Sequence, residues 1–212
     1  AEHQTLGRGQ QGRRWASIPG QHLQFSVVLH PPLSPAELPT LSLAAGVAVA
    51  RAVESHLGLT PQLKWPNDVL LGQRKVCGIL VESKPSATGV QRVVIGIGLN
   101  CNGGPEQYPP ELRETVTTLS AEAGRAIDRE ALLQVVLLEL EQMLQTLTAL
   151  GTRPLLDAWR ERGLIRGTRV RIPTHTGHQT GRPLGISAEG YLRVAADDGV
   201  EHTVVSGRVE WL

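Results

Sequence analysis

Two apolar, β-rich segments at 76–82 and 93–99 constrain the fold of this chain more than any other feature. Such runs predict central strands, because a strand that is buried on both faces has no polar side to present to water. The stretch between them, 84–91, is turn-like. At 23–29 apolar residues alternate with mostly polar ones, which predicts a further strand. The core is therefore expected to form around a β-sheet.

Shorter elements complete this first part of the chain. Residues 41–57 are rich in Ala and Val and end at Gly58, which predicts a helix. A brief strand is expected at 62–65, followed by a turn at 66–68 and a short apolar run at 69–71. The next three residues, 72–74, resemble a hairpin turn that leads into the first central strand.

A long helix is predicted after Asp128, which is expected to cap its first turn, and the helix ends at Gly151. A short helix at 154–162 follows it. One face of the long helix carries an apolar stripe, which we interpret as core rather than as a groove for a partner. The stripe consists of Leu133, Val136, Leu137, Leu140, Leu144 and Leu147.

The pattern of apolar and turn-forming residues changes near residue 166. From there, short β-like runs alternate with turns that contain Gly and Asp, which predicts a small barrel. The runs lie at 169–172, 179–187, 191–195, 201–206 and 208–212. We therefore expect two domains, 1–165 and 166–212.

Composition limits the partners of this 212-residue chain. The 21 Lys and Arg nearly balance the 20 Asp and Glu, so net charge gives no reason to expect general affinity for nucleic acids or membranes. No apolar stretch approaches the roughly 20 residues that span a bilayer, and no signal peptide is visible. Cys77 and Cys101 lack metal-ligand spacing and are expected to be buried thiols in the cytoplasm. Because functional-looking residues follow Ala1 at once, we expect further residues upstream.

The segment 7–15 reads GRGQQGRRW, with three glycines among three arginines and a closing tryptophan. Glycine lets the backbone approach a ligand closely, and arginine presents a planar, charged fork that suits carboxylate and phosphate. This composition predicts a loop that wraps a small anion. A solvated surface loop is the alternative, and the segment by itself does not separate the two.

The turn KWPND at 64–68 places a cation, an amide and a carboxylate at one edge. The carboxylate of Asp68 could hold Mg²⁺. The alternative is an Asn-Asp turn with a solvated Lys64.

Two further segments contain polar groups next to apolar strands. Lys75 stands at the mouth of the strand 76–82, and Gly78 within it indicates close approach of a ligand or backbone. The alternative for Lys75 is a strand-edge lysine that discourages edge pairing. The segment 96–102 reaches Asn100, which could read a base edge or simply form a turn. It is not a dinucleotide fingerprint, because no helix follows at once.

Taken together, these segments resemble the successive motifs of biotin protein ligases, in order and in spacing. The resemblance includes Gln4-Thr5 and the segments 7–15, 64–68, 74–82 and 96–100, and it extends over the whole chain. It implies an α+β fold, with a mixed sheet and flanking helices related to class II synthetases, followed by an SH3-like barrel. It also implies that ATP and Mg²⁺ convert biotin to biotinyl-5′-AMP. Biotin then passes to a lysine of a biotin carboxyl carrier protein, a subunit of acetyl-CoA carboxylase.

The resemblance also implies roles for single residues. Because a carboxylate and a triphosphate must meet, several cations are needed near the reacting centre. The catalytic residues are then Lys75, Lys64, Asp68 and Arg8, with Asp68 orienting or deprotonating the incoming lysine or holding the metal. Lys75 would reach the biotin carboxylate and Asn100 the adenine. The binding residues are Gln4, Thr5, Gly7, Arg8, Gly9, Gln10, Trp15, Asn67, Lys75, Gly78 and Asn100.

Two departures from the family pattern matter. Many bacterial members have arginine where this chain has Gln10, so we expect looser retention of biotinyl-AMP, since a charge-assisted hydrogen bond contributes about 1.5–3 kcal/mol. The Ser/Thr-rich segment that normally precedes Gln4 is not within this sequence. No helix-turn-helix is visible either, so no repressor role is predicted for these residues.

Two alternatives remain open at this stage. A lipoate or octanoyl ligase or transferase would use a similar scaffold. The presence of both motifs, at 64–68 and at 74–82, argues against this class of enzyme. A biotin-sensing regulator that binds nucleic acid through its C-terminal barrel is less favoured, because that barrel mixes arginines with acidic residues and has few aromatics. We expect no nucleic acid and no membrane as partners, and a homodimer is possible.

Overall fold

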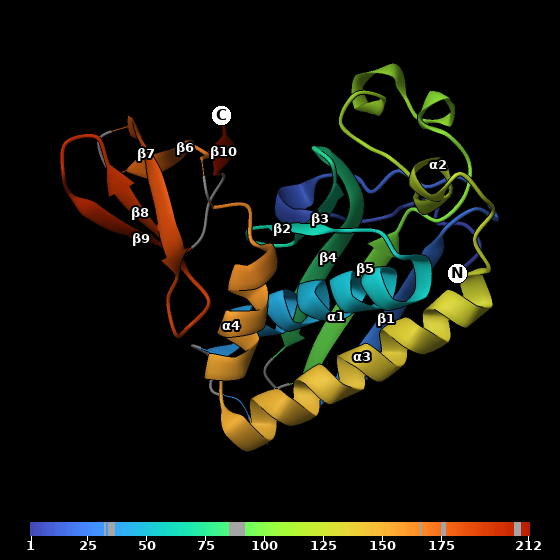
Figure 1. The fold of residues 1–212 in the computed structure, drawn as a ribbon, viewed down its shortest axis with the longest axis horizontal. Coiled ribbons are helices and arrows are strands. Elements are labelled where there is room, and N and C mark those ends of the chain that lie inside the picture. The colour runs from blue at the N-terminus through green and yellow to red at the C-terminus, as the bar shows by residue number, and fades with distance from the viewer. Residues whose placement is uncertain (32, 34–36, 85–91, 166, 175–176, 206–208) are drawn as a thin grey trace.

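The computed structural model describes residues 1–31, 33, 37–84, 92–165, 167–174, 177–205 and 209–212 (Figure 1). Its larger sheet has five strands in the order β1-β5-β4-β3-β2, and neighbouring strands pair antiparallel. The strands are β1 (Leu23–Leu29), β2 (Gln62–Lys64), β3 (Asp68–Leu71), β4 (Arg74–Lys84) and β5 (Arg92–Leu99). The two apolar segments are thus central, as predicted. A mixed sheet was expected, but among the described residues parallel pairing is limited to two isolated bridges, Leu63–Gly163 and Lys75–Val116.

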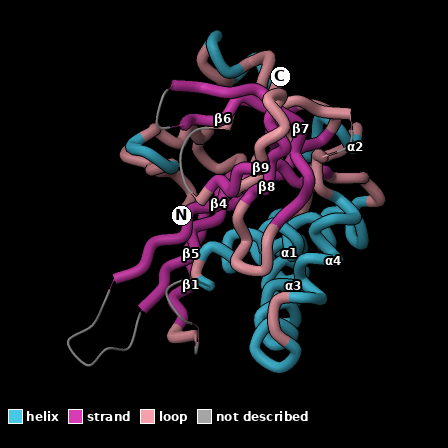
Figure 2. Tube along the Cα trace, turned by 90° about the vertical axis from the view of Figure 1, so that its left-hand side faces the viewer, coloured by secondary structure: helices cyan, strands magenta, loops and turns pink. Residues whose placement is uncertain are grey.

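Three helices cover one face of this sheet: α1 (Pro39–Leu57), α3 (Arg129–Leu150) and α4 (Arg153–Arg162) (Figures 1 and 2). Helix α1 is buried along most of its length, because its small Ala and Val residues let neighbouring elements pack closely on it. It ends at Gly58, whose φ of 68° is left-handed. As predicted, Asp128 caps α3 by accepting hydrogen bonds from the main-chain N–H groups of Glu130 and Ala131.

The core face of α3 differs in part from the predicted stripe. Val136, Leu140 and Leu147 are buried as expected. Leu137, however, is 40% exposed, so its assignment to the core was wrong. Leu132 and Met143 occupy the core positions instead. The helix turns about 100° per residue, so a broad apolar stripe does not by itself show which edge faces the neighbouring helix.

The strand β5 shows how the sheet separates its two faces. Its burial alternates along the strand, and Ile95, Ile97 and Leu99 point into the core beneath the helices. Gly96 and Gly98 therefore lie on the opposite face, where side chains alternate.

The C-terminal part forms a second five-stranded sheet in the order β10-β6-β7-β8-β9, also antiparallel. Its strands are β6 (Val170–Thr174), β7 (Gly177–Ile186), β8 (Leu192–Ala196), β9 (Glu201–Val204) and β10 (Glu210–Trp211). Within the described residues β9 and β10 do not pair, so the predicted barrel is not closed there. The buried Nε1 of Trp65 donates to the carbonyl of Gly190 at 2.9 Å and links the two sheets.

Some predictions fall outside the described residues, namely most of the turn at 84–91, Arg166 and the region 206–208. The thiols of Cys77 and Cys101 are free and buried, as expected. Burial raises the pKa of Cys101 to about 12 and that of Cys77 further still. None of the helices in the described parts of the chain is long and apolar enough to cross a membrane.

Candidate functional site

A pocket of about 890 Å³ lies on the face of the larger sheet that the helices leave free. The N-terminal segment forms one wall of the pocket, and the segment that follows Asn100 forms another. Most of the residues that the sequence singled out contribute to its lining. They are Gln4, Thr5, Gly7, Arg8, Gly9, Gln10, Trp15, Lys64, Asn67, Asp68, Lys75, Gly78 and Asn100. The tertiary structure thus brings the separate motifs together around one cavity.

Glycines form the floor of the pocket beneath the indole of Trp15. Gly78 on β4 and Gly98 on β5 are register partners. A Cβ at Gly98 would lie 2.6 Å from Cε2 of Trp15, and one at Gly78 would lie 2.7 Å from Cζ3. The indole therefore rests directly on two strands at a place where only glycine leaves room. A group does approach Gly78 closely, as predicted, but it is the side chain of Trp15 and not the expected ligand or backbone.

Lys75 and Asp68 form an ion pair beside the indole. The Lys75 Nζ lies 2.5 Å from Oδ1 of Asp68 and 5.4 Å from the centre of the Trp15 ring. Both charged side chains are about one quarter exposed, which is dry enough to strengthen their attraction relative to open water. This arrangement fixes a cation and a carboxylate at one end of the glycine floor.

Lys64 adds a second cation near this pair, since it is the register partner of Asp68 across β2 and β3. Burial lowers the pKa of Lys64, while the nearby carboxylate of Asp68 opposes that change. The cations Lys75 and Arg13 lower it further. The site thus concentrates positive charge, and an anionic ligand would relieve the resulting repulsion.

The loop 7–15 folds back on itself above the pocket. The N–H of Trp15 donates to the carbonyl of Gly7 at 2.9 Å, and the N–H of Gly9 donates to the carbonyl of Arg13 at 2.7 Å. Arg8 extends across to Glu82 on β4, with 2.9 Å between Nη2 and Oε2. Both side chains of this pair are substantially exposed, so it is worth little to stability and can exchange for a ligand.

Asn67 and Asn100 use part of their amides to hold neighbouring backbone. The Nδ2 of Asn67 donates to the carbonyl of Ile79 at 2.7 Å. The Nδ2 of Asn100 donates to the carbonyl of Thr117 at 3.1 Å. Oδ1 of Asn100, however, has no hydrogen-bond partner among the described residues, and the side chain is 1% exposed. Asn100 therefore contributes a buried acceptor without a partner among the described residues to the lining of the pocket.

The sequence reasoning missed a second wall, the segment 105–117. It includes the single turns η3 (Pro105–Gln107) and η4 (Pro110–Leu112) and lines the pocket with Tyr108, Leu112 and Val116. The N–H of Lys75 donates to the carbonyl of Thr115 at 2.8 Å, which fastens this wall beside the ion pair. Its turns carry no long apolar pattern, so only the prolines signalled a compact loop.

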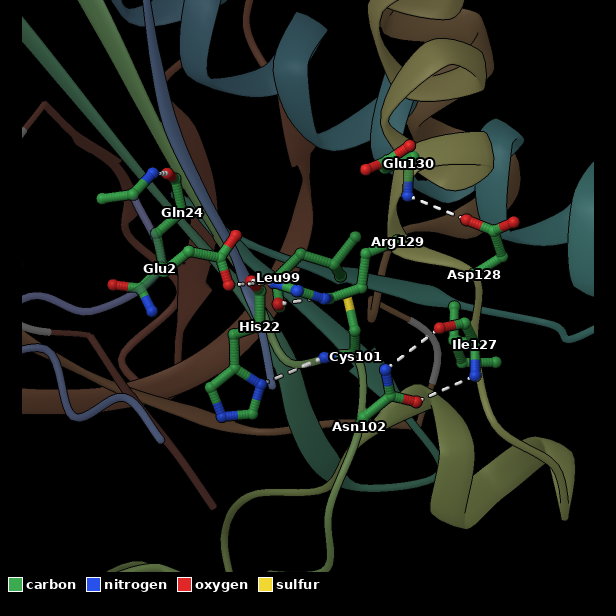
Figure 3. Close-up of polar contacts among 11 residues, drawn as sticks. Glu2, His22, Gln24, Leu99, Cys101, Asn102, Ile127, Asp128, Arg129 and Glu130 are labelled. Atoms are coloured by element: carbon green, nitrogen blue, oxygen red, sulfur yellow. Dashed lines mark hydrogen bonds and ion pairs between the residues drawn. The ribbon is translucent and has the colours of Figure 1, made fainter. Parts of the chain in front are cut away.

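A polar network around His22, just before β1, holds the residues that lead into this wall, and Figure 3 shows its contacts with Cys101 and Arg129 and those of Asn102. The N–H of Cys101 donates to Nδ1 of His22 at 3.2 Å, and the hydroxyl of Tyr108 lies 3.1 Å from Nε2 of the same ring. Arg129 donates to the carbonyl of His22 at 3.0 Å. Nearby, Asn102 exchanges two hydrogen bonds with the main chain of Ile127. Together these contacts fix the start of the second wall.

The metal prediction rests on Asp68 alone. The described residues contain no cluster of three or more His, Cys, Asp or Glu that could hold a metal. A single carboxylate fits the mode in which Mg²⁺ takes one or two protein carboxylates and the phosphates of a substrate.

This combination of a charged, glycine-floored pocket on an α+β sheet and a following small β-sheet has clear counterparts among known proteins. Residues 1–100 match the Biotin/lipoate A/B protein ligase family, and residues 166–211 match the Biotin protein ligase C terminal domain.

Individual relatives agree with these family matches. A biotin--[acetyl-CoA-carboxylase] ligase of Paracoccus denitrificans is 34% identical over 195 residues, which are 91% of this chain and 81% of that protein. A bifunctional ligase/repressor of Bacillus subtilis is 37% identical over 201 residues, which are 95% of this chain and 62% of that protein.

The fold agrees as well. The structure of the biotin protein ligase from Aquifex aeolicus in complex with biotin and ATP superposes with a TM-score of 0.86. The two chains are 29% identical, and the match covers 100% of this chain and 86% of the other. The chain belongs to the biotin protein ligase family. It spans 62% of the length of the two Bacillus relatives.

Proposed function

We propose that this chain activates biotin with ATP and transfers it to a lysine of a biotin carboxyl carrier protein. The observation that carries the proposal is the Lys75–Asp68 ion pair beside Trp15 in the glycine-floored pocket. In the first step a biotin carboxylate oxygen bonds to the α-phosphorus of ATP as the bond to pyrophosphate breaks. In the second, the carrier lysine amine bonds to the acyl carbon, AMP leaves, and the amine loses a proton.

Lys75 and Lys64 would lower the repulsion between the carboxylate and the phosphates, because both cations are fixed before the substrates arrive. Arg8 would leave Glu82 and close over the acyl-adenylate with the backbone of Gly9 and Gln10. Asp68 would accept hydrogen bonds from the incoming lysine ammonium or serve as its base. Asp68 is the residue that would hold Mg²⁺, which would supply further neutralisation of negative charge.

The remaining predicted contacts fit the same scheme. Gln4 and Thr5, which line the pocket, would contact biotin next to Gly7. Trp15, which rests on the glycines beneath it, would support the ligand. Asn100 would offer its Oδ1, which has no partner among the described residues, to the adenine.

The test is a carrier-biotinylation assay with purified protein, biotin, ATP, Mg²⁺ and a carrier domain. Lys75→Ala and Arg8→Ala should both lose activity, whereas Arg125→Ala, which removes an exposed charge beyond the pocket, should not. Full activity in both site variants would contradict the assignment. Incorporation of lipoate in preference to biotin would instead support the lipoate ligase alternative.

The further partners are proposals as well. Nucleic acid binding by the C-terminal sheet is not favoured, because three of its arginines are held in the ion pairs Arg169–Asp197, Arg171–Glu210 and Arg193–Glu201. A homodimer could form at β1, an edge strand that exposes Val28.

We keep the division into two domains, 1–165 and 166–212. We place the enzyme in the cytoplasm because its buried thiols are free.

A further inference from the structure

A buried glutamine, whose side-chain amide has no partner in the described parts of the chain, lies on the floor of the pocket. Gln24 on β1 is 3% exposed, and neither its Oε1 nor its Nε2 has a hydrogen-bond partner among the described residues. Its main-chain carbonyl accepts a bond from the amino group of Ala1, which leaves the side-chain amide unused (Figure 3). An unsatisfied buried polar group costs about 1–3 kcal/mol, so the fold gains nothing from a glutamine here. A ligand that pairs with the amide would account for it.

The position of Gln24 in the sheet shows which part of the pocket it faces. It is the register partner of Gly98, the glycine on which the Trp15 indole rests. Its strand neighbours Leu23 and Phe25 pack into the core on the other face, so Gln24 belongs to the pocket face.

Two more unpaired polar groups surround the same glycine. Nε1 of Trp15 is buried and unpartnered, and it lies 2.9 Å from the place where a Cβ of Gly98 would be. Asn100, which directly follows β5 two residues after Gly98, carries the acceptor Oδ1, which has no hydrogen-bond partner among the described residues. Diagonal neighbours across two strands are close enough for long side chains to meet on one ligand. The cluster offers two acceptors and two donors beside a flat aromatic surface.

Adenine matches this set. Its exocyclic amine offers two hydrogens, which Oε1 of Gln24 and Oδ1 of Asn100 can accept, and a ring nitrogen beside that amine can accept from Nε2 of Gln24. A carboxamide commonly pairs with adenine through two such bonds. We propose that Gln24 is a specificity-determining residue that reads the amino edge of the adenine of ATP. This inference rests on the proposed function, because it assigns one of the two proposed substrates to this part of the pocket.

The test uses Gln24→Met, which keeps the size of the side chain and removes its polar atoms. ATP and purine riboside triphosphate, which lacks the 6-amino group, are titrated separately in the absence of biotin, so that no turnover occurs. Wild-type protein should bind ATP about tenfold more tightly than the analogue. Gln24→Met should bind ATP about tenfold more weakly than the wild type does. Its affinity for the analogue should fall only slightly, and its affinity for biotin should stay unchanged. Gln134→Met, which alters an exposed position on α3, serves as the control.

A second measurement separates this role from a structural one. Without ligand, Gln24→Met should unfold at the same temperature as the wild type or higher, because an unsatisfied buried amide has been removed. Unchanged ATP affinity of Gln24→Met, or weakened biotin binding, would overturn the proposal. So would a variant that discriminates between ATP and the analogue as strongly as the wild type does, because the two changes would then act independently. A wild type that binds ATP with this discrimination but biotinylates no carrier would contradict only the proposed function.

Discussion

The sharpest prediction concerns His22, whose imidazole is 1% exposed and joins β1 to the second wall of the pocket. The main-chain N–H of Cys101 can only donate, so Nδ1 of His22 must be an unprotonated acceptor. The hydrogen then sits on Nε2 and is donated to the hydroxyl oxygen of Tyr108. Protonation of Nδ1 would set two N–H groups against each other. The folded protein therefore holds His22 neutral.

The size of the effect follows from its pKa. Burial, assisted by the nearby charge of Arg129, lowers the pKa of His22 from 6.5 to about 4. Each pKa unit corresponds to about 1.4 kcal/mol, so neutral His22 contributes about 3 kcal/mol relative to the protonated ring. The unfolded chain binds this proton more readily. The contribution is complete above pH 6.5, falls as the pH decreases, and is lost near pH 4.

The assay is urea unfolding from pH 4 to pH 8 for the wild type and for His22→Gln, which keeps one donor and one acceptor. Carboxylates also titrate in this range, but they do so in both proteins and cancel in the difference. The difference in unfolding free energy should change by about 3 kcal/mol between pH 7 and pH 4. His56→Gln, at an exposed position near the end of α1, is the matched control, because it makes the same substitution away from the network around His22. A difference that is constant with pH would refute a neutral, buried His22.

Three more predictions test the pocket and its surroundings. Gly98→Ala should displace Trp15 and destabilise the protein by about 1–3 kcal/mol in thermal unfolding, whereas Gly96→Ala, whose Cβ would have 3.6 Å of room, should be tolerated. Equal effects of the two would contradict the glycine floor. Gln10→Arg should slow dissociation of biotinyl-AMP roughly tenfold in a trapping assay, and an unchanged rate would end the hypothesis of loose retention. Trp65→Phe should lower stability by about 1–3 kcal/mol in chemical unfolding, because a buried carbonyl loses its donor.

Much of the local structure followed from the sequence. The alternation at 23–29 and the apolar runs predicted β1, β4 and β5, and single residues such as Gly58 and Asp128 marked helix ends correctly. Strands and helix ends depend on residues only a few positions apart. The spacing of apolar residues and the type of capping residue can therefore be read directly from the sequence. The motifs also predicted which segments would meet, since most of their residues line one pocket.

Contacts between distant residues were decided only by the tertiary structure. Arg8 and Glu82 are 74 positions apart, and His22 and Tyr108 are 86 apart. No local pattern announces such pairs, because they depend on strand order and register.

The same holds for the pocket floor. The sequence established glycines within apolar strands and a tryptophan after an arginine-rich loop. The register of β4 and β5 decided that Gly78 and Gly98 lie side by side under Trp15. The register of β1 on β5 then placed Gln24 beside them, where a glutamine in an otherwise ordinary strand becomes a buried, unpaired amide. Local sequence thus determined the elements, whereas sheet register determined which side chains share a site, because side chains on three different strands become neighbours only once those strands have paired.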